Sequence, residues 1–437
     1  IDKISEFIIT LIENEKNNLT WYLVNDPGCL SEYDPNAMTI EVARKYIHNF
    51  LKVNLETEFV NTEDALDRIL GETIISKINV PNYNNSAMDG FAFNLDSLIE
   101  KNTLKVATTI LAGDLSKQKI KPGFAAQIMT GSKIPDGTDT VLPFELVKQE
   151  NDSIVVNEIP KKGVNIRRLG EDIKKNGEVL KKGVYLRPAE IGLIASIGIS
   201  RVKVFKKLKV SFFSTGDEVV KAGQPIKSGQ VYDSNHFTIQ SMLKRINVEC
   251  VDLGIIPDDK KLIEKTFKNA AKISDAIITT GGVSVGKADY MKDILKKIGK
   301  VLFWKLSIKP GRPMAYGAFK NTPYFGLPGN PVAAMITFYQ LVQPALKYLM
   351  GHDGYKLPTL FKAKCAAPIT KRPGRMEFQR GFYNSHNGEL SVKPTPHQGS
   401  GILSSMSKAN CLIVLDMDQK SIKVDDYVNI QLMEGLV

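Results

Sequence analysis

The chain has 437 residues, of which 43% are hydrophobic and 24% are charged, and its formal net charge is +11. This composition is typical of a soluble globular protein with roughly two to four domains, because one hydrophobic core rarely serves so long a chain. No apolar run approaches the roughly 18 residues of a membrane-spanning helix, and the charged first residues do not resemble a signal peptide. The positive balance favours an anionic partner, either nucleic acid or a small phosphorylated ligand.

The cysteines and histidines argue against several kinds of site. The four cysteines lie far apart without a CxxC pair, so neither a zinc site nor a disulfide framework is predicted, and a reducing cytoplasm is the expected location. The five histidines show no HxxxH or HExxH spacing, which disfavours a zinc-hydrolase site. Neither an RRM aromatic signature nor a basic and aromatic stripe is present, so binding of nucleic acid is not predicted.

The first part of the chain is predicted to be helical. Residues 1–36 form an extension in which the apolar spacing predicts a short amphipathic packing helix. Thr39 suits a helix N-cap, and apolar positions with helical spacing follow it to about Val53. A second helix is expected over residues 62–70, where Gly71 ends it.

Between residues 74 and 172 the pattern changes to short β-rich runs broken by Gly, Pro and Asn, which predicts a small β domain. Its turns carry clusters of acidic or hydroxyl side chains at residues 86–90, 112–114, 129–132 and 170–173. Each cluster taken alone is typical of a turn. A helix is then predicted over residues 187–200, with Pro188 in its first turn.

From residue 209 onward the chain alternates strands with helices, which predicts a doubly wound α/β domain. Predicted strands lie at 209–214, 250–256, 275–280, 301–308 and 323–326, and predicted helices lie at 235–245, 260–272 and 333–341. Most of these strands end in Gly, Pro, Asp or Lys, and parallel sheets bind ligands outside the carboxyl ends of their strands. Several polar loops are therefore expected at one sheet edge. Residues 357–437 return to short β runs, at 361–366, 390–394, 411–415 and 427–432, which predict a terminal β domain.

The loop after the third of these strands is suited to holding an anion. The apolar run ends in Gly281 and Gly282, Gly286 follows, and a helix is expected over residues 291–297. Glycines let backbone N–H groups approach an anion closely, and the hydroxyl of Ser284 adds a donor. The loop matches neither the dinucleotide fingerprint nor the Walker pattern. A ligand loop and a plain tight turn therefore remain open as interpretations of this loop alone.

The polar loops at the predicted sheet edge combine both signs of charge. The carboxylates are Asp217, Glu218, Asp258, Asp259 and Asp289, and the cations are Lys305, Lys309 and Arg312. Carboxylate oxygens bind Mg²⁺ and lysines neutralise the remaining anion, so the pattern suits a metal-bridged phosphate. Scattered surface salt bridges remain the alternative interpretation of any single residue in this set.

With these motifs assembled, the chain from about Met38 to its C-terminus resembles the MoeA family, the molybdopterin molybdenumtransferases. The motifs occur in family order and are SAMDGFAF (86–93), AGD (112–114), MTGSKIPDGTD (129–139), GEDI (170–173), STGDE (214–218), LGIIPDD (253–259), TTGGVSVGKADY (279–290), FWKLSIKPGRP (303–313), FGLPGNP (325–331), PGRMEFQRG (373–381) and HQGS (397–400). Phe91 stands where Tyr is frequent, and Thr279 with Thr280 stand where serines are common. Neither departure removes a charged group.

The resemblance implies an enzyme of molybdenum cofactor biosynthesis. Family members take adenylylated molybdopterin, insert molybdate at its dithiolene and release AMP, with Mg²⁺ needed. The resemblance also implies a cytoplasmic homodimer, in which the α/β domain of one subunit and the small β domain of the other build the active cleft. Transient contacts with other proteins of molybdenum cofactor biosynthesis are expected as well.

The implied fold class is α/β plus β, in an elongated multi-domain chain. It combines a doubly wound molybdopterin-binding α/β domain, a small β domain inserted in a helical or mixed domain, and a C-terminal domain resembling a β-barrel. The predicted divisions are 1–36 for the N-terminal extension, 37–75 with 174–206 for the helical or mixed domain, 76–173 for the small β domain, 207–356 for the α/β domain and 357–437 for the C-terminal β domain.

The resemblance also carries functional roles onto individual positions. The candidate catalytic residues are Asp89, Thr130, Asp172, Glu218 and Asp289. The candidate Mg²⁺ ligands are Glu218, Asp258 and Asp289. The candidate contacts to molybdopterin, AMP or molybdate are Gly281, Gly282, Ser284, Gly286, Lys305, Lys309, Gly311, Arg312, Pro328, Gly329, Arg380 and Ser400. Among these, Lys305, Lys309, Arg380 and Ser400 are expected to face oxyanions.

Three alternatives to molybdate insertion remain open from the sequence. The first is adenylyl transfer to molybdopterin, which uses a similar glycine-rich loop without these flanking β domains. The second is a non-catalytic scaffold of the kind formed by the gephyrin E domain, against which the intact acidic and basic motifs argue. The third is insertion of tungstate, which nearly equals molybdate in size and charge.

Overall fold

The computed structural model describes residues 37–53, 55–98, 101–114, 119–282, 294, 300–352 and 354–433. The helix predicted within residues 1–36 lies outside this part of the chain, as does the one predicted at 291–297 apart from the buried Ile294. The chain divides into two compact units. The α/β–barrel unit comprises residues up to Thr57 and from Phe205 onward, and the β unit comprises Glu58–Val204. The five predicted domain boundaries stay a prediction.

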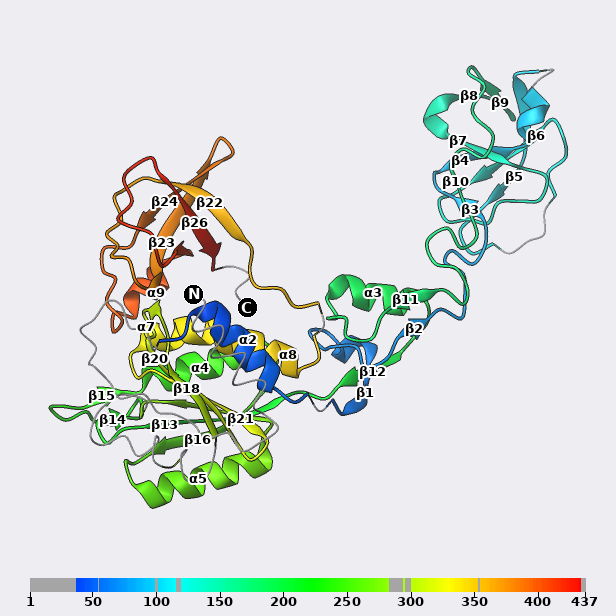
Figure 1. The fold of residues 1–437 in the computed structure, drawn as a ribbon. Coiled ribbons are helices and arrows are strands. Elements are labelled where there is room, and N and C mark those ends of the chain that lie inside the picture. The colour runs from blue at the N-terminus through cyan, green and yellow to red at the C-terminus, as the bar shows by residue number, and fades with distance from the viewer. Residues whose placement is uncertain are drawn as a thin grey trace. The chain divides into compact units, whose positions relative to one another are not determined.

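A six-stranded sheet forms the core of the α/β part of the α/β–barrel unit, with the order β16-β13-β17-β21-β20-β18 (Figure 1). Its strands are β13 (Lys209–Thr215), β16 (Glu249–Ile256), β17 (Ala276–Thr280), β18 (Lys300–Lys305), β20 (Pro313–Phe319) and β21 (Thr322–Leu327). The first four strands in this order are parallel, whereas β20 and β18 are antiparallel to their neighbours. The parallel strands confirm the sequence prediction, and β20 has no counterpart in it.

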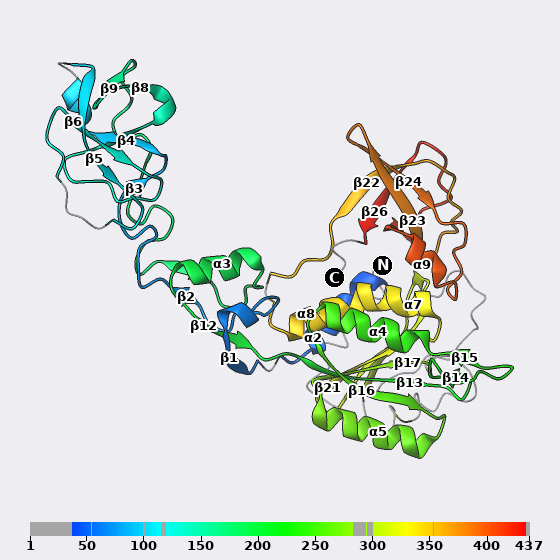
Figure 2. The same cartoon turned by 180° about the vertical axis from the view of Figure 1, so that it is seen from behind.

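Helices cover both faces of this sheet, as expected for a doubly wound domain. Helix α5 (Lys260–Ile273) packs on one face, where the Phe267 ring meets the rings of Phe213 and Tyr324 at centroid distances of 5.3 and 5.1 Å. Helices α4 (Ser234–Arg245) and α7 (Pro331–Thr337) lie together on the other face (Figure 2). Within the described residues, no helix is both long enough and apolar enough to cross a membrane.

Helix α2 (Ile40–Phe50) belongs to the α/β–barrel unit and packs against α8 (Gln343–Leu349). A π-helical turn over Phe338–Val342 joins α7 to α8. The Oγ1 atom of Thr39 accepts a hydrogen bond from the Val42 amide, which confirms the predicted N-cap. A short parallel pair, β14 (Val219–Val220) with β15 (Val231–Tyr232), stands between β13 and α4 in the sequence.

The single strand predicted over residues 301–308 is wrong, because β18 ends at Lys305 and β19 (Ile308–Lys309) joins another sheet. The Leu306 amide donates to the Arg312 carbonyl at 2.8 Å, which closes a loop between the two strands. Strand β19 then pairs with residues 376–377. The β-forming residues of 301–308 do not indicate with which strand each half of the segment pairs.

The C-terminal sheet closes into a five-stranded barrel, because β23 pairs with both β24 and β25. Its strands are β22 (Leu360–Cys365), β23 (Met376–His386), β24 (Glu389–Pro394), β25 (Cys411–Leu415) and β26 (Tyr427–Leu432), with the short helix α9 (Ser404–Lys408) before β25. Residues from four of the strands, including Ala363, Val392 and Ile413, form its core. The predicted barrel-like domain is confirmed, although β23 was not among the predicted runs.

The β unit contains a second six-stranded sheet, with the order β7-β4-β6-β5-β9-β8. Its strands are β4 (Gly90–Phe93), β5 (Thr103–Ile110), β6 (Phe124–Ile128), β7 (Thr140–Pro143), β8 (Val147–Glu150) and β9 (Ser153–Val156). The two-stranded pairings are β3 (Asn85–Ser86) with β10 (Ile166–Arg167), β2 (Ile74–Ile75) with β11 (Glu178–Leu180), and β1 (Thr57–Asn61) with β12 (Arg201–Phe205). Helix α3 spans Pro188–Ser196 and has Pro188 in its first turn, as predicted.

The helix predicted over residues 62–70 is wrong. Only a 3₁₀ turn forms, at Thr62–Asp64, and Asp67 then adopts φ +60°. The following residues pair with distant backbone, since Ile69 bridges Tyr185 and Leu70 bridges Val204. Tertiary pairing of these buried side chains overrides a helical spacing that the local sequence does contain.

Candidate functional site

Three neighbouring parallel strands, β13, β17 and β21, bring their carboxyl ends together. Gly281 follows β17 with φ +82°, and a Cβ atom there would lie 2.4 Å from the carbonyl oxygen of Thr215, which ends β13. A Cβ atom on Gly329, which follows β21, would lie 4.0 Å from the Cα atom of Gly281. Position 281 therefore requires glycine, both for its left-handed backbone and for this close approach. Loops from three strands meet at this sheet edge, as the sequence predicts.

Two carboxylates at the end of β13 lie beside a third at the end of β16. The Asp217 carboxylate accepts a hydrogen bond from the Asp258 amide at 3.1 Å. Burial of the Asp258 side chain raises its pKa, and the negative charges of Asp217 and Glu218 raise it further. The carboxylate of Glu218 folds back over Gly216, where a Cβ atom would lie 2.7 Å from Oε2. The result is a cluster of like charges that a cation would relieve.

Glu218 and Asp258 are thus close enough to influence each other, while Asp289, the third predicted Mg²⁺ ligand, lies outside the described residues. Ser284 and Gly286 lie outside them as well. Within the ranges that the structure covers, no group of three Asp, Glu, His or Cys residues is arranged to hold a metal ion. The oxygen donors and the repulsion among them fit Mg²⁺ chemically, and the assignment of Mg²⁺ stays a prediction.

Replacing Asp258 with asparagine is expected to raise the stability of the protein modestly. When folding raises the pKa of an acid, the protein becomes less stable as the pH rises from the pKa of that acid in the unfolded state, here 3.8, to its pKa in the folded state. The variant avoids this loss, so its gain is complete at pH 7 and absent near pH 3. Because water partly screens the group, we expect at most about 1 kcal/mol. Urea unfolding at both pH values measures the effect, and an unchanged or lower stability at pH 7 would contradict it.

Lys309 stands on the barrel side of the site. It lies opposite Glu377 in the pairing of β19 with β23, and its Nζ atom is 3.3 Å from Oε1 of that carboxylate. The Lys309 side chain is 48% exposed, whereas that of Glu377 is 3% exposed. The second oxygen of Glu377 accepts a hydrogen bond from Gln379 Nε2 at 2.9 Å. A buried and oriented carboxylate therefore holds the Lys309 ammonium at a half-exposed position.

Arg380 lies three residues after Glu377 on β23 and is almost fully buried. Its Nε atom donates to Ser405 Oγ at 3.1 Å, and its Nη2 atom donates to the Gly399 carbonyl at 3.2 Å. Burial lowers the pKa of the guanidinium to about 10, so that it remains cationic at neutral pH. The next residue, Ser400, accepts a hydrogen bond at its carbonyl from the Val332 amide of α7 at 3.0 Å. Arg380 and Ser400 therefore share one neighbourhood with the start of α7.

Other predicted contact residues have structural surroundings of their own. Lys305 ends β18 opposite Pro313, and thus belongs to the α/β sheet rather than to the sheet of Lys309. Arg312 is half-buried beside it, and Pro328 is buried in the loop after β21. A Cβ atom on Gly311 would lie 2.7 Å from Thr337 Cγ2. Packing against α7 therefore accounts for glycine at position 311 without a ligand.

In the β unit, Asp89 and Thr130 form an exposed pair. The Thr130 amide and hydroxyl both donate to Asp89 Oδ1, at 2.6 and 2.7 Å. These two hydrogen bonds lower the pKa of the Asp89 carboxyl. Asp172 is also exposed, and its amide donates to the Val80 carbonyl at 3.1 Å. Among the residues that the structure describes, no hydrogen bond joins Asp172 to the Asp89–Thr130 pair.

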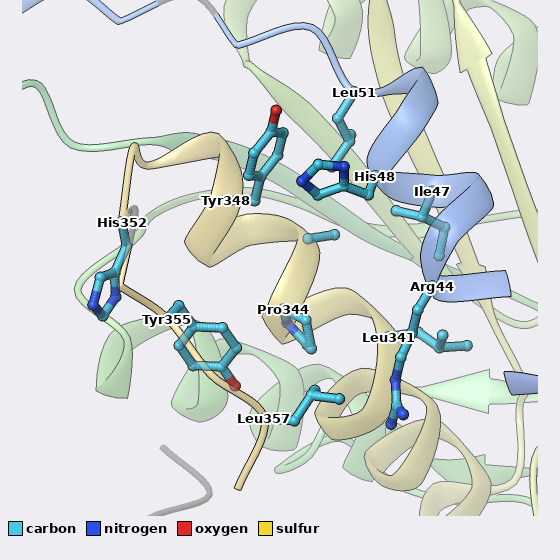
Figure 3. Close-up of a pocket in the computed structure, with 11 residues that line it drawn as sticks. Arg44, Ile47, His48, Leu51, Leu341, Pro344, Tyr348, His352, Tyr355 and Leu357 are labelled. Atoms are coloured by element: carbon cyan, nitrogen blue, oxygen red, sulfur yellow. The ribbon is translucent and has the colours of Figure 1, made fainter. Parts of the chain in front are cut away.

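A cavity of about 330 Å³ lies elsewhere in the α/β–barrel unit, between α2, α8 and the segment that follows α8 (Figure 3). Its lining includes His48, Tyr348 and Tyr355, and none of the predicted site residues takes part. Arg44, also in the lining, donates from Nε and Nη2 to the carbonyl and side-chain oxygens of Gln340, at 2.9 and 2.6 Å. This cavity is therefore distinct from the sheet-edge site.

Sequence reasoning did not single out Glu377, which pairs with Lys309, or Asn235, whose Nδ2 atom donates to the Gly329 carbonyl at 2.7 Å, or the nearby Asp233. Glu377 lies on β23, a strand that local patterns did not predict, so that no sequence signal pointed to it. Asp233 and Asn235 stand at the first turn of α4, where Asp233 is the N-cap. A search for helix-capping residues before the predicted helix 235–245 could have found Asp233.

The fold, together with the loops that follow β13, β17 and β21, defines a multi-domain α/β protein with its candidate ligand site at the carboxyl edge of a parallel sheet. Three family models match the chain in order. They are the MoeA N-terminal region (domain I and II) at residues 38–198, a probable molybdopterin binding domain at residues 211–348, and the MoeA C-terminal region (domain IV) at residues 362–433.

Known relatives agree with these models. The chain is 44% identical over 396 residues to a molybdopterin molybdenumtransferase of Haemophilus influenzae, covering 90% of this chain and 98% of that relative. It is 33% identical over 380 residues to one of Nostoc, covering 83% and 86% of the two chains. The crystal structure of a Pyrococcus horikoshii OT3 MoeA protein matches with TM-score 0.78 and 29% identity, over 91% of this chain and 100% of that one. The chain belongs to the MoeA family of molybdopterin molybdenumtransferases, which confirms the resemblance.

Proposed function

We propose that this chain inserts molybdenum, supplied as molybdate, into the dithiolene of adenylylated molybdopterin and releases AMP in a reaction that needs Mg²⁺. Membership of the family makes the chain a transferase of molybdenum cofactor biosynthesis. The observation that supports the proposed insertion reaction is that the loops at the sheet edge and the residues of the barrel form one connected set of contacts. Close contacts lead from Gly281 to Gly329, and through Val332 to Ser400 and Arg380.

Electrostatics explains why cations are needed at this place. Molybdate is a dianion, and it must approach a substrate that already carries an anionic pyrophosphate, so that fixed positive charges must offset the repulsion. Lys309 offers a half-exposed ammonium, and Arg380 offers a buried guanidinium that stays charged. We assign both residues, with Ser400 and Lys305, to the oxyanions.

The acidic residues are proposed to serve the step that releases AMP. Glu218, Asp258 and Asp289 would hold Mg²⁺, which polarises a phosphoanhydride when it is bound. Asp89, Thr130 and Asp172 are proposed to complete the cleft from the β unit of a second subunit. The homodimer, the cytoplasmic location and transient contacts with other proteins of cofactor synthesis are part of the same proposal, which the family resemblance supports.

The direct test incubates the purified full chain with adenylylated molybdopterin, Mg²⁺ and molybdate, and follows AMP and finished cofactor together. Molybdate-dependent AMP release with matching cofactor formation is the expected result. Tight binding of adenylylated molybdopterin without AMP release would contradict it and favour the scaffold function. Formation of adenylylated molybdopterin from ATP would favour adenylyl transfer, and a higher rate with tungstate would change the assigned oxyanion.

A further inference from the structure

Within the described residues, buried oxygens without hydrogen-bond partners occur at the first turn of α4 and at the end of β13. Almost all buried polar atoms in proteins form hydrogen bonds, so an unpaired one calls for an explanation. The side chains of Thr215, Asp233 and Asn235 are each more than nine-tenths buried. Each nevertheless has an oxygen that makes no hydrogen bond within the part of the chain that the structure describes: Oγ1, Oδ2 and Oδ1 respectively.

The orientation of Asn235 is fixed by its neighbour across the site. Its Nδ2 atom donates to the Gly329 carbonyl at 2.7 Å, so that Oδ1 must be the atom on the other side of the amide. Gly329 lies against Gly281, and Gly281 lies against the end of β13 at Thr215. The unpaired oxygens of Asn235 and Thr215 therefore belong to the same meeting of loops as the proposed molybdopterin site.

Asp233 adds a second oriented acceptor. Its Oδ1 atom accepts from the His236 amide at 2.9 Å and thereby caps α4, which leaves Oδ2 as the unpaired atom. An oxygen of a carboxylate and an oxygen of an amide both accept hydrogen bonds and both repel anions. This turn is therefore unsuited to molybdate or pyrophosphate. It suits a ligand that presents N–H donors.

The substrate has two heterocycles that could supply such donors. A pterin presents an amino group beside a ring N–H, which places two donors next to each other. Adenine presents its amino group beside ring nitrogens that are themselves acceptors, and these would face the protein oxygens with like polarity. Two acceptors carried by residues of one turn therefore match the pterin better than the adenine.

We propose that Asp233 and Asn235, with the hydroxyl of Thr215, form the subsite for the amino and amide edge of the pterin. The inference rests on the proposed function, because that function supplies the pterin. It places the uncharged end of the substrate at α4, so that its anionic groups extend towards Lys309 and Arg380. A site of this kind rejects an analogue that lacks the matching donor, since its buried acceptor is then left unpaired.

The test is a substitution that changes one acceptor into a donor and keeps the helix cap. In Asp233→Asn the carboxamide oxygen can still cap α4, because Asn is as good an N-cap as Asp, while its amino group takes the place of Oδ2. The matched control is Asp259→Asn, since Asp259 caps α5 in the same way, with Oδ1 accepting from the Leu262 amide at 2.7 Å, and is exposed.

Ligand-detected NMR titrations of the full chain with pterin, lumazine and AMP give the dissociation constants. Lumazine carries an oxygen in place of the pterin amino group. We expect the unaltered protein to bind pterin about tenfold or more tightly than lumazine, and Asp233→Asn to weaken pterin binding by a similar factor. AMP binding should be unchanged in both variants, which also shows that they are folded, and Asp259→Asn should bind pterin normally.

Three outcomes would overturn the proposal. One is equal affinity of the unaltered protein for pterin and lumazine. Another is normal pterin binding by Asp233→Asn. The third is a loss of AMP binding in that variant alone, which would assign the turn to adenine. Failure of the proposed function is a separate result, because the insertion assay could show no cofactor formation while the preference for pterin over lumazine remains.

Discussion

Replacing Lys309 with alanine is expected to reduce molybdate-dependent cofactor formation about a hundredfold or more. The half-exposed ammonium is a fixed positive charge placed where a dianion must approach a second anion. Removal of one such preorganised group typically costs about 10² to 10³ in rate. The rate should be measured over a range of molybdate concentrations, because a lost oxyanion contact should be partly recovered at high molybdate.

A possible loss of stability in this variant has to be separated from the loss of charge. Without Lys309, the buried carboxylate of Glu377 keeps Gln379 as its one hydrogen-bond partner within the described part of the chain, and an incompletely paired buried charge is destabilising. The double variant Lys309→Ala with Glu377→Gln should therefore recover stability in urea without recovering activity. Lys364→Ala, which breaks the Lys364–Asp425 pair at 3.1 Å on the barrel surface, is the matched control and should remain active. Normal activity of Lys309→Ala would remove Lys309 from the proposed mechanism.

The elements that could be predicted from sequence are those whose pattern is local. Helices α4 and α5 carry helical apolar spacing behind capping aspartates, and β13 and β17 are short apolar runs that end in turn residues. Strand β23 was missed because its alternation is interrupted by polar residues that are buried in this fold, Glu377, Gln379 and Arg380. Only the long-range pairings of the barrel make those positions interior.

The same distinction applies to the site. Motif order found Lys309, Arg380 and Ser400, and the structure places the last two together beside α7. The motif order could not show that Gly311 is explained by packing against α7, or that a buried oxygen of Asp233 has no partner among the residues the structure describes. Burial depends on segments that are far apart in the sequence, so that no spacing rule could reveal these two facts.

Replacing Arg380 with lysine is expected to reduce cofactor formation about a hundredfold even though the positive charge is kept. Lysine lacks the planar fork that lets one side chain donate both to Ser405 and to the Gly399 carbonyl. Both acceptors lie in or beside the loop that carries Ser400, so the loop should lose its fixed position. Leaving buried acceptors unpaired should also lower the free energy of unfolding by about 1–3 kcal/mol.

The response to molybdate distinguishes this variant from Lys309→Ala. A displaced loop cannot be restored by more substrate, so high molybdate should not recover the activity of Arg380→Lys. In the unaltered protein the pKa of Arg380 is about 10, so its guanidinium stays charged between pH 6 and pH 8 and the activity should show no change from its titration in that range. Arg187→Lys is the matched control, because Arg187 pairs with Glu190 at 2.7 Å on an exposed surface. Full activity in Arg380→Lys would mean that charge alone matters at this position and that the fork does not hold the loop.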